Sequence, residues 1–400
     1  MVGTMAKIDD SVKKKVPELR FKGFTDDWEE RKFKDILKTH SFRSYLAGVS
    51  ENGEYEVIQQ GDKPIVGYSD GEPFTDYKDV TLFGDHTVSL YKPKSPFFVA
   101  TDGVKILSAD NFEGNYLYTT LERYKPEPQG YKRHFTILKN QDVWFTENME
   151  EQQKIGSFFK QLDDTIALHQ RKLDLLKEQK KGYLQKMFPK NGAKVPELRF
   201  AGFADDWEER KLGDEVKING RIGFRGYTQA DIVTKETGVL AYSPTNIVNN
   251  RLYRKQSDTY ITKQKYRESP EIMVKNSDIL FVKTGSTLGK SALVQGINYH
   301  ATVNPQIVII RSNELDEYFL SVILTSYNIL KRINTIKIGG AIPTMTETEL
   351  KKFPIQVPKS TEQKKIGSFF KQLDNTIALH QRKLDLLKEQ KKGFLQKMFV

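Results

Sequence analysis

The sequence predicts two mixed α/β domains joined by two long helices that form an antiparallel coiled coil, with a pseudo-two-fold internal repeat. Two observations predict this class. Residues 150–189 return at 361–400 with thirty-five of forty positions identical, and residues 16–35 return at 195–214 with sixteen of twenty positions identical. The segments between these repeats show no similarity to each other, so a duplicated frame holds two unlike inserts.

Each copy of the longer repeat predicts one long helix. Its apolar side chains recur at steps of four and three residues, which is the heptad spacing of a coiled-coil seam. A forty-residue helix is roughly 60 Å long and cannot cover its own seam, so the other copy is the natural partner. The seam residues are Ile155, Phe159, Leu162, Ile166, His169, Leu173 and Leu176 in the first copy and Ile366, Phe370, Leu373, Ile377, His380, Leu384 and Leu387 in the second.

Two seam lysines predict the direction in which the helices run. In a parallel pair Lys180 would share a layer with Lys391, and the two ammonium groups would repel each other. An antiparallel pair sets Lys180 against Leu373 instead, and it sets His169 against Leu384 near the centre. We therefore expect antiparallel pairing. A parallel pair stays open as the alternative, because lysine stems can reach from a seam to solvent.

Each insert alternates short strand-like runs with Gly, Pro and Asp turns, the pattern of a mixed α/β domain. In the first insert we expect strands at 54–61, 79–85, 95–100 and 103–107 and a helix at 115–123. In the second we expect strands at 238–244, 277–285, 290–294 and 305–312 and a helix at 314–333.

These elements predict five segments along the chain. Capping boxes of Asn148 with Glu151 and of Ser360 with Gln363 are expected to begin the two long helices. The segments are an N-terminal extension at 1–15, a first domain at 16–149, a first spacer helix at 150–189, a second domain at 190–360 and a second spacer helix at 361–400.

Composition narrows the compartment and the partner. The chain has 400 residues and no cysteine, which excludes disulfides and thiolate metal sites and favours a reducing cytoplasm. No apolar run is long enough for a membrane span or a signal peptide, so we expect a cytoplasmic protein without membrane contact. The net charge of +11 suggests a polyanionic partner. The charge is uneven, with −5 on residues 16–149 and +5 on residues 195–360.

Three motifs that could carry chemistry fall short of the patterns they resemble. The GSTLGKS run at 285–291 has three residues between its glycines, where a phosphate-binding loop needs four, so a glycine hairpin between strands is the plain alternative. NPQI at 304–307 is similar to an adenine-methylase motif but lacks its second proline and its aromatic residue. Asp278 with Lys283 lacks the further carboxylates of a nuclease site. We expect no catalytic residue and no metal site.

Basic residues interleaved with tyrosine are the candidates for contact with DNA, because arginine can bind guanine and lysine can neutralise phosphates. A solvated basic surface is the alternative for all of them. In the second insert the candidates are Arg221, Arg225, Tyr227, Arg251, Tyr253, Arg254, Lys255, Lys263, Lys265, Tyr266, Arg267, Lys283, Ser286, Thr287 and Lys290. In the acidic first insert they are Lys92, Lys94, Arg123, Lys125, Lys132, Arg133 and His134, which should cluster in space if this insert binds DNA.

The duplicated frame, together with DILFVKTGSTLGKSALV (278–294), GGAIPTMTETELKKFPIQVP (339–358) and LFGDHTVSLYKPKSPFFVATDGVKIL (82–107), resembles the specificity subunits of type I restriction-modification enzymes over residues 16–400. The resemblance implies that each insert is a target recognition domain for one half of a bipartite DNA site. It further implies that the helices fix the gap between the half-sites and bind two adenine methyltransferase subunits. The first insert lacks the TGSTLGK and GGAIP sequences of the second, so loop roles do not transfer between them.

The sequence therefore predicts a non-catalytic subunit that recognises an asymmetric, two-part site in double-stranded DNA. It would carry no cofactor itself. S-adenosylmethionine would belong to the two methyltransferase subunits, and ATP and Mg²⁺ to restriction subunits where these are present. The alternatives are a coiled-coil adaptor whose domains bind proteins, and a self-sufficient methylase or nuclease.

Overall fold

The computed structural model describes residues 15–130, 132–190, 192–223, 226–337 and 343–400. The chain divides into two compact units. Unit 1 comprises the residues up to Arg171 together with His380–Val400, and unit 2 comprises Lys172–Leu379. Each unit contains part of both long helices. Arg225, most of the predicted N-terminal extension and the GGAI sequence at 339–342 lie outside the described residues.

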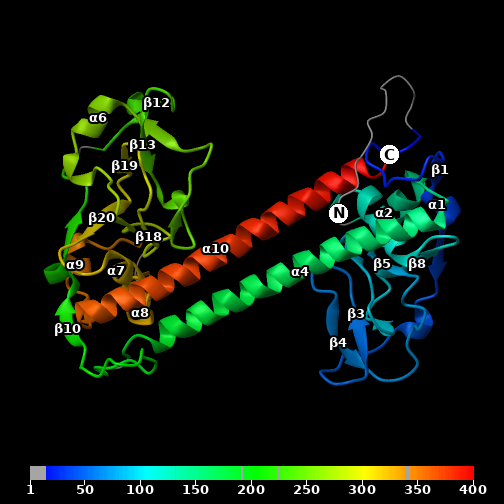
Figure 1. The fold of residues 1–400 in the computed structure, drawn as a ribbon, viewed down its shortest axis with the longest axis horizontal. Coiled ribbons are helices and arrows are strands. Elements are labelled where there is room, and N and C mark those ends of the chain that lie inside the picture. The colour runs from blue at the N-terminus through cyan, green and yellow to red at the C-terminus, as the bar shows by residue number, and fades with distance from the viewer. Residues whose placement is uncertain (1–14, 131, 191, 224–225, 338–342) are drawn as a thin grey trace. The chain divides into compact units, whose positions relative to one another are not determined.

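The longer repeats form helices α4 (Met149–Lys186) and α10 (Ser360–Lys397), each of 38 residues (Figure 1). In unit 1, the N-terminal half of α4 packs beside the C-terminal part of α10, with Lys391 Nζ 2.6 Å from Asp163 Oδ1. In unit 2, the C-terminal part of α4 packs beside the N-terminal half of α10, with Lys180 Nζ 2.6 Å from Asp374 Oδ1. The predicted antiparallel coiled coil is therefore confirmed.

One pairing at the seam differs from the prediction. Nδ1 of His169 lies 3.2 Å from Nδ1 of His380, so the two imidazoles contact each other, where the prediction set His169 against Leu384. A half-buried ring nitrogen needs a hydrogen-bond partner, and a leucine cannot supply one.

The shorter repeats hold the ends of the long helices through a buried ion pair in each unit. The Arg20 guanidinium donates to both carboxylate oxygens of Glu151 at 2.6 and 2.8 Å, and Arg199 does the same to Glu362 at 2.8 Å. Both carboxylates are almost fully buried. The box predicted at Asn148 is only half formed, because Asn148 Oδ1 accepts from the Glu151 N–H while the Glu151 carboxylate is engaged by arginine.

The other predicted capping box is wrong. Gln363 does not return to Ser360. Its Nε2 donates to the Pro358 carbonyl oxygen, and its Oε1 accepts from the backbone N–H of Asp316. The Gln363 side chain bonds to these backbone groups of the adjoining domain because a buried amide must satisfy both its donor and its acceptor.

Unit 1 carries a domain that we call head 1, in which all the predicted strands and the predicted helix are present. Its sheets have the orders β2-β8-β5-β6, β4-β3-β7 and β1-β9. The strands are β1 (Glu29–Lys32), β2 (Leu37–His40), β3 (Tyr55–Ile58), β4 (Ile65–Ser69), β5 (Thr81–Gly84), β6 (Leu90–Tyr91), β7 (Phe97–Val99), β8 (Val104–Ala109) and β9 (Asp142–Phe145). The helices are α1 (Phe33–Ile36), α2 (Gly114–Tyr124) and α3 (His134–Asn140).

Unit 2 carries head 2, which has two four-stranded sheets in the orders β11-β20-β17-β18 and β12-β16-β13-β19. Two smaller pairs, β10-β21 and β14-β15, complete its strands. The strands are β10 (Glu208–Lys211), β11 (Val216–Asn219), β12 (Ile232–Val233), β13 (Val239–Tyr242), β14 (Ile247–Val248), β15 (Arg251–Leu252), β16 (Thr259–Ile261), β17 (Ile279–Val282), β18 (Ser291–Leu293), β19 (Ala301–Val303), β20 (Ile307–Ser312) and β21 (Pro354–Val357). The helices are α5 (Leu212–Glu215), α6 (Lys263–Arg267), α7 (Glu317–Ile323), α8 (Tyr327–Lys337) and α9 (Glu347–Lys351).

The single helix predicted at 314–333 is two helices, α7 and α8. The break falls at Thr325 and Ser326, whose backbone N–H groups donate three residues back to the carbonyls of Val322 and Ile323. The Thr325 hydroxyl donates to the same Val322 carbonyl. Such local hydrogen bonds compete with the helical ladder, and the apolar spacing alone could not reveal them.

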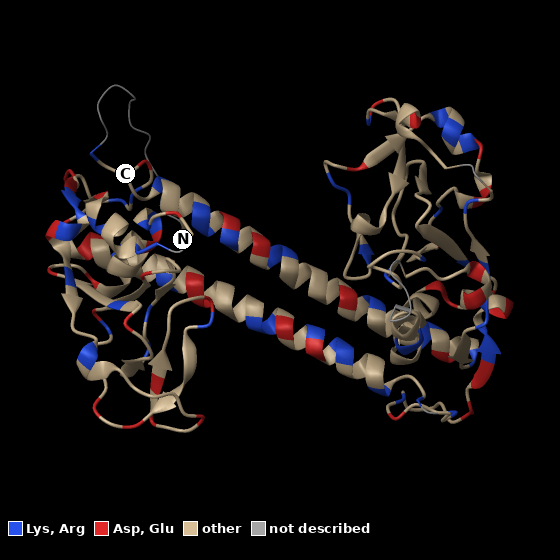
Figure 2. Cartoon of the chain, turned by 180° about the vertical axis from the view of Figure 1, so that it is seen from behind, with Lys and Arg blue, Asp and Glu red and all other residues tan. Residues whose placement is uncertain are grey.

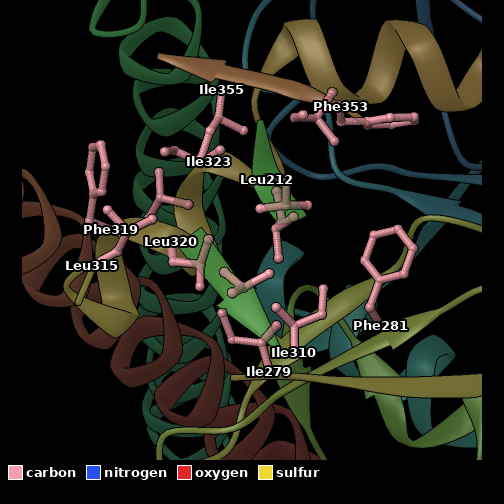
Figure 3. Close-up of a cluster of buried hydrophobic side chains, with 14 of the residues drawn as sticks. Leu212, Ile279, Phe281, Ile310, Leu315, Phe319, Leu320, Ile323, Phe353 and Ile355 are labelled. Atoms are coloured by element: carbon pink, nitrogen blue, oxygen red, sulfur yellow. The ribbon is translucent and has the colours of Figure 1, made fainter. Parts of the chain in front are cut away.

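The core of head 2 is continuous with the seam of the long helices. Figure 3 shows a part of this core. Ile279, Phe281 and Ile310 project from its central sheet, Leu320 comes from α7, and Ile355 comes from β21. Seam residues Ile366 and Phe370 of α10 belong to the same buried cluster. In head 1, Ile155 and Phe159 of α4 join the core in the same way. Each head is therefore seated on the helix pair by shared apolar packing.

A glycine in each long helix lets a head approach closely. A Cβ at Gly156 would lie 2.8 Å from the backbone nitrogen of Tyr116, and a Cβ at Gly367 would lie 3.1 Å from that of Phe319. The first turns of α2 and α7, with their capping residues Glu113 and Asp316, therefore approach the long helices at positions that have no side chain of their own. Within the described residues, no helix is long and apolar enough to cross a membrane.

Candidate nucleic-acid interface

One exposed basic surface of head 2 lies on α6. Thr262 caps this short helix by accepting from the backbone N–H of Lys265. Lys263 and Arg267 are exposed, whereas Lys265 is paired with Glu268 at 2.7 Å. Figure 2 shows Lys and Arg gathered along this helix. The helix thus presents two cations to solvent.

A shallow hollow of about 660 Å³ brings further cations of head 2 together, lined in part by Lys235, Arg254 and Lys255. The Arg254 guanidinium lies 4.8 Å above the Tyr299 ring, donates to the Tyr260 hydroxyl at 2.6 Å and lies 3.5 Å from the buried Asp258 carboxylate. These contacts hold its charge at the surface in a fixed orientation, which is what directional recognition of a base edge requires.

Most of the other contacts predicted in head 2 are engaged within the domain or with α10, and Tyr253 is the exception. Arg221 is half-buried and donates to the Val303 carbonyl oxygen at 2.9 Å, and burial lowers the pKa of its guanidinium. The half-buried Tyr227 ring lies 5.9 Å from this guanidinium. Arg251 donates to Asn375 of α10 at 3.3 Å. Tyr253 is exposed, and Tyr266 is half-buried against the His300 ring.

The GSTLGKS segment is the glycine hairpin between β17 and β18. Gly285 and Gly289 have positive φ angles of 100° and 89°, which glycine adopts without strain. Ser286 and Lys290 are exposed at this turn, and Thr287 is half-buried. Lys283 is paired with Glu347 at 3.4 Å. The exposed side chains of Ser286 and Lys290 could meet a phosphate backbone.

The basic residues predicted in head 1 do not form one cluster. Lys92 and Lys94 lie near the N-terminus of α2, where a hollow of about 790 Å³ also contains Lys78 and Lys160. Arg123 lies in the last turn of α2, roughly 15 Å away along an eleven-residue helix, and the others follow this helix in the chain. There, Arg123 lies over the Tyr124 ring, and Lys125, Lys132 and Arg133 are exposed.

Two of these residues have structural roles. His134 is fully buried, with Nε2 accepting from the Gln129 N–H and Nδ1 beside the Asp85 carbonyl oxygen. The Lys92 ammonium donates to the carbonyl oxygens of Lys78 and Val80, and burial lowers its pKa to about 8. Neither side chain is free to contact DNA, because its polar atoms are already engaged inside the domain.

The negative charge of head 1 is concentrated around β3 and β4. Residues 51–79 contain eight acidic and two basic side chains, and seven of the eight acids are exposed. In Figure 2, positions occupied by Asp or Glu are red on the loops at the ends of this part of head 1. The net charge of residues 51–79 is therefore −6, whereas that of the whole domain is −5. The rest of head 1 is thus not acidic.

Sequence reasoning missed four exposed leucines on the long helices. Leu168 and Leu175 of α4 are 67% and 53% exposed, and their repeat equivalents in α10, Leu379 and Leu386, are 63% and 51% exposed. On each helix the two leucines are seven residues apart and therefore share a face away from the seam. The repeat itself could have revealed them, because an apolar residue outside a seam is unusual at the same place twice.

No group of three or more His, Asp or Glu side chains that could hold a metal ion occurs within the described residues. The ionisable groups of head 2 that are strongly shifted are tyrosines. Burial raises the pKa of Tyr242, and the Tyr299 hydroxyl 2.7 Å away adds to the shift. The Tyr242 hydroxyl therefore stays neutral.

Two unlike recognition domains on a duplicated helical frame define a two-headed binding protein. Residues 25–178 and 204–389 both match the family of type I restriction modification DNA specificity domains. The chain therefore belongs to this family, as its sequence motifs suggested.

Relatives and solved structures agree. The chain is 23% identical over 255 residues to the type I restriction enzyme MjaVIII specificity subunit of Methanocaldococcus jannaschii, covering 62% of this chain and 59% of that protein. It is 22% identical over 252 residues to the putative MjaX specificity subunit of the same organism, covering 62% and 56%. The matches thus span less than two thirds of these relatives.

The fold is similar to the crystal structure of the S subunit of a type I restriction-modification system from M. genitalium. The TM-score is 0.66 at 14% identity, over 96% of this chain and 99% of that one. A chain from a structural study of complex assembly in the type I R-M system gives a TM-score of 0.50 at 12% identity, over 93% and 97%. At these identities the likeness concerns the fold.

Proposed function

We propose that this chain is the DNA-recognition subunit of a type I restriction-modification complex and that its two heads bind the two halves of an asymmetric site. The observation that carries the proposal is the duplicated frame with unlike inserts. Two identical heads would be expected to bind a palindromic site, whereas two different heads would be expected to bind two different half-sites. Half-sites about one helical turn apart, ~34 Å, are within the reach of a 38-residue helix.

The charge of head 2 supports DNA as the ligand. Lys255, Lys263 and Arg267 are exposed and can neutralise phosphates, and the oriented Arg254 guanidinium can reach a base edge. In head 1 the exposed Lys125, Lys132 and Arg133 would serve the same purpose.

The exposed leucines support a second part of the proposal, the docking of two methyltransferase subunits. The removal of such side chains from water is favourable when a partner helix covers them. Because Leu168 and Leu175 of α4 recur as Leu379 and Leu386 of α10, the surface is present twice. Two copies of one partner can therefore bind. S-adenosylmethionine, ATP and Mg²⁺ would belong to partner subunits, and this chain would contribute recognition without catalysis.

The test of recognition is a mobility-shift selection on randomised duplex DNA, with the purified chain and its methyltransferase subunits. We expect enrichment of one sequence in two separated parts and a steep fall in affinity with salt. Absence of a two-part sequence would refute the recognition role, and affinity indifferent to salt would favour an adaptor that binds protein.

The test of docking replaces Leu168 and Leu379 by Glu. We expect this pair of changes to abolish co-purification of the methyltransferase subunits, because charge is costly in an apolar contact. The control replaces the exposed lysines Lys177 and Lys388, which occupy equivalent positions on the same helices, by Glu. Equal behaviour of the two double variants would contradict a docking role for the leucines.

A further inference from the structure

Lys391 of α10 joins three elements in unit 1. Its Nζ lies 2.6 Å from Asp163 of α4 and 2.6 Å from Glu122 of α2 in head 1. Only 10% of the lysine side chain is exposed. One buried ammonium therefore connects its own helix, the partner helix and the recognition domain.

Lys180 of α4 occupies the equivalent place in unit 2. Its Nζ lies 2.6 Å from Asp374 Oδ1, and the other oxygen of Asp374 accepts from the Tyr318 hydroxyl of α7 at 2.9 Å. Burial raises the pKa of Tyr318, and the neighbouring carboxylate adds to the shift, so the phenol stays neutral and keeps donating. Head 2 is thus connected to both long helices by a lysine, an aspartate and a tyrosine.

A charge in an apolar seam is tolerated only where its partner lies within reach. If either helix shifted along the other, the ammonium would leave its carboxylate and both would remain partly buried without a partner. Buried polar contacts of this kind are known to fix the register of paired helices. Lys391 also binds Glu122 of head 1, and Asp374 also binds Tyr318 of head 2. These contacts therefore fix the position of each head on the helices together with the register.

We infer that Lys180 with Asp374, and Lys391 with Asp163, are positioning residues that set how many base pairs separate the two half-sites. This inference rests on the proposed recognition of a two-part site. One additional base pair moves a half-site by ~3.4 Å along the DNA axis and also rotates it. Heads held rigidly on the helix pair therefore cannot bind both half-sites at the changed spacing. If the contacts between the heads and the long helices are weakened, we expect sites with neighbouring spacings to be bound as well. The sequence of each half-site would stay the same.

The experiment is sequencing of modified adenines in a host that expresses the chain with its methyltransferase subunits. The variant carries Lys180→Met and Lys391→Met, which keep the aliphatic volume in the seam and remove the charge. The control carries Lys177→Met and Lys388→Met at exposed equivalent positions on the same helices. The wild-type chain and the control are expected to give one spacing. The seam variant is expected to give the same half-sites with discrimination against spacings one base pair longer or shorter reduced by about fivefold or more.

A second pair of variants separates positioning from stability. Lys180→Glu alone places two carboxylates together and should broaden the spacing or abolish modification, whereas Lys180→Glu with Asp374→Lys restores an opposite-charge pair and should restore a single spacing. An unchanged single spacing in the folded methionine variant, or no rescue by the charge exchange, would overturn the inference. A wild-type chain that modifies no two-part site would instead refute the proposed function.

Discussion

The two places where a long helix ends are alike, whereas the two heads beside them are not. At the end of α10 the Phe399 ring packs 5.7 Å from Trp28, and at the end of α4 the equivalent Phe188 packs 5.9 Å from Trp207. The Arg–Glu pairs repeat in the same way. Head 1 combines four-stranded, three-stranded and two-stranded sheets, whereas head 2 has two four-stranded sheets and two strand pairs. The repeated residues hold the heads, and the unrepeated residues differ between them, as the proposed recognition of two different half-sites requires.

The largest expected effect tests whether the two repeated phenylalanine–tryptophan contacts stabilise the chain equally. Phe188→Ala and Phe399→Ala each remove a buried ring and should each lower the free energy of unfolding by ~3–5 kcal/mol. Urea unfolding of the full chain, followed by tryptophan fluorescence, measures both. A decrease below ~1 kcal/mol in either variant would show that the duplicated contact is not used equally.

The second-largest effect on the free energy of unfolding is expected from the two buried Arg–Glu ion pairs. Arg20→Ala and Arg199→Ala each leave a buried carboxylate without its partner, and we expect the free energy of unfolding to fall by ~3 kcal/mol in each case. Arg31→Ala is the matched control, because its carboxylate partners Glu29 and Glu147 are both exposed and such pairs contribute ~1 kcal/mol or less. Similar unfolding midpoints for Arg20→Ala and Arg31→Ala would contradict the importance of burial.

How much of this arrangement the sequence predicts depends on the kind of residue. Heptad spacing and the repulsion between seam lysines are sufficient to predict antiparallel helices, because both depend on local spacing and on charge. The partners of Glu151 and Gln363 could not be predicted, since each side chain leaves its expected cap for a partner far along the chain. For the same reason the sequence pattern predicts a surface cation at His134, although this side chain is buried.

The site is less predictable than the fold. Basic residues mark a charged surface, but the sequence does not show which of them fold inward, as Arg221 and Lys92 do. The split of the predicted cluster in head 1 follows from the length of α2, which separates the basic residues before this helix from those at its end and beyond.

A smaller effect should distinguish the two heads in DNA binding. Lys255→Gln with Lys263→Gln in head 2 is expected to lower the slope of log affinity against log salt by about 1 for each phosphate that the replaced lysine neutralised. Lys125→Gln with Lys132→Gln in the acidic head 1 should lower it less. Titration of duplex DNA at several salt concentrations measures the slopes, with Lys177→Gln as the control. Equal changes in both heads would contradict the contrast in charge.

The smallest effect concerns Lys92, whose pKa is lowered to about 8 from 10.5. Between these values the unfolded chain binds more protons than the folded chain, so this group makes the protein more stable as pH rises through the window. Below pH 8 both states are protonated and the cost of the buried charge is fully present. Lys92→Met should remove a rise of less than ~1 kcal/mol per pH unit between pH 8 and 10. Urea midpoints at pH 7 to 10 that shift in parallel for both proteins would contradict this sign.

Two different recognition domains held by one duplicated frame are central to the proposed function. The most direct measurement replaces the second insert, residues 215–360, by a second copy of the first, residues 36–149, and sequences the modified adenines in a host that expresses the methyltransferase subunits. Because the long helices run antiparallel, we predict that the natural two-part site is replaced by an inverted repeat of the half-site that head 1 recognises. An unchanged asymmetric site, or a direct repeat of one half-site, would contradict recognition by two separate heads on an antiparallel frame.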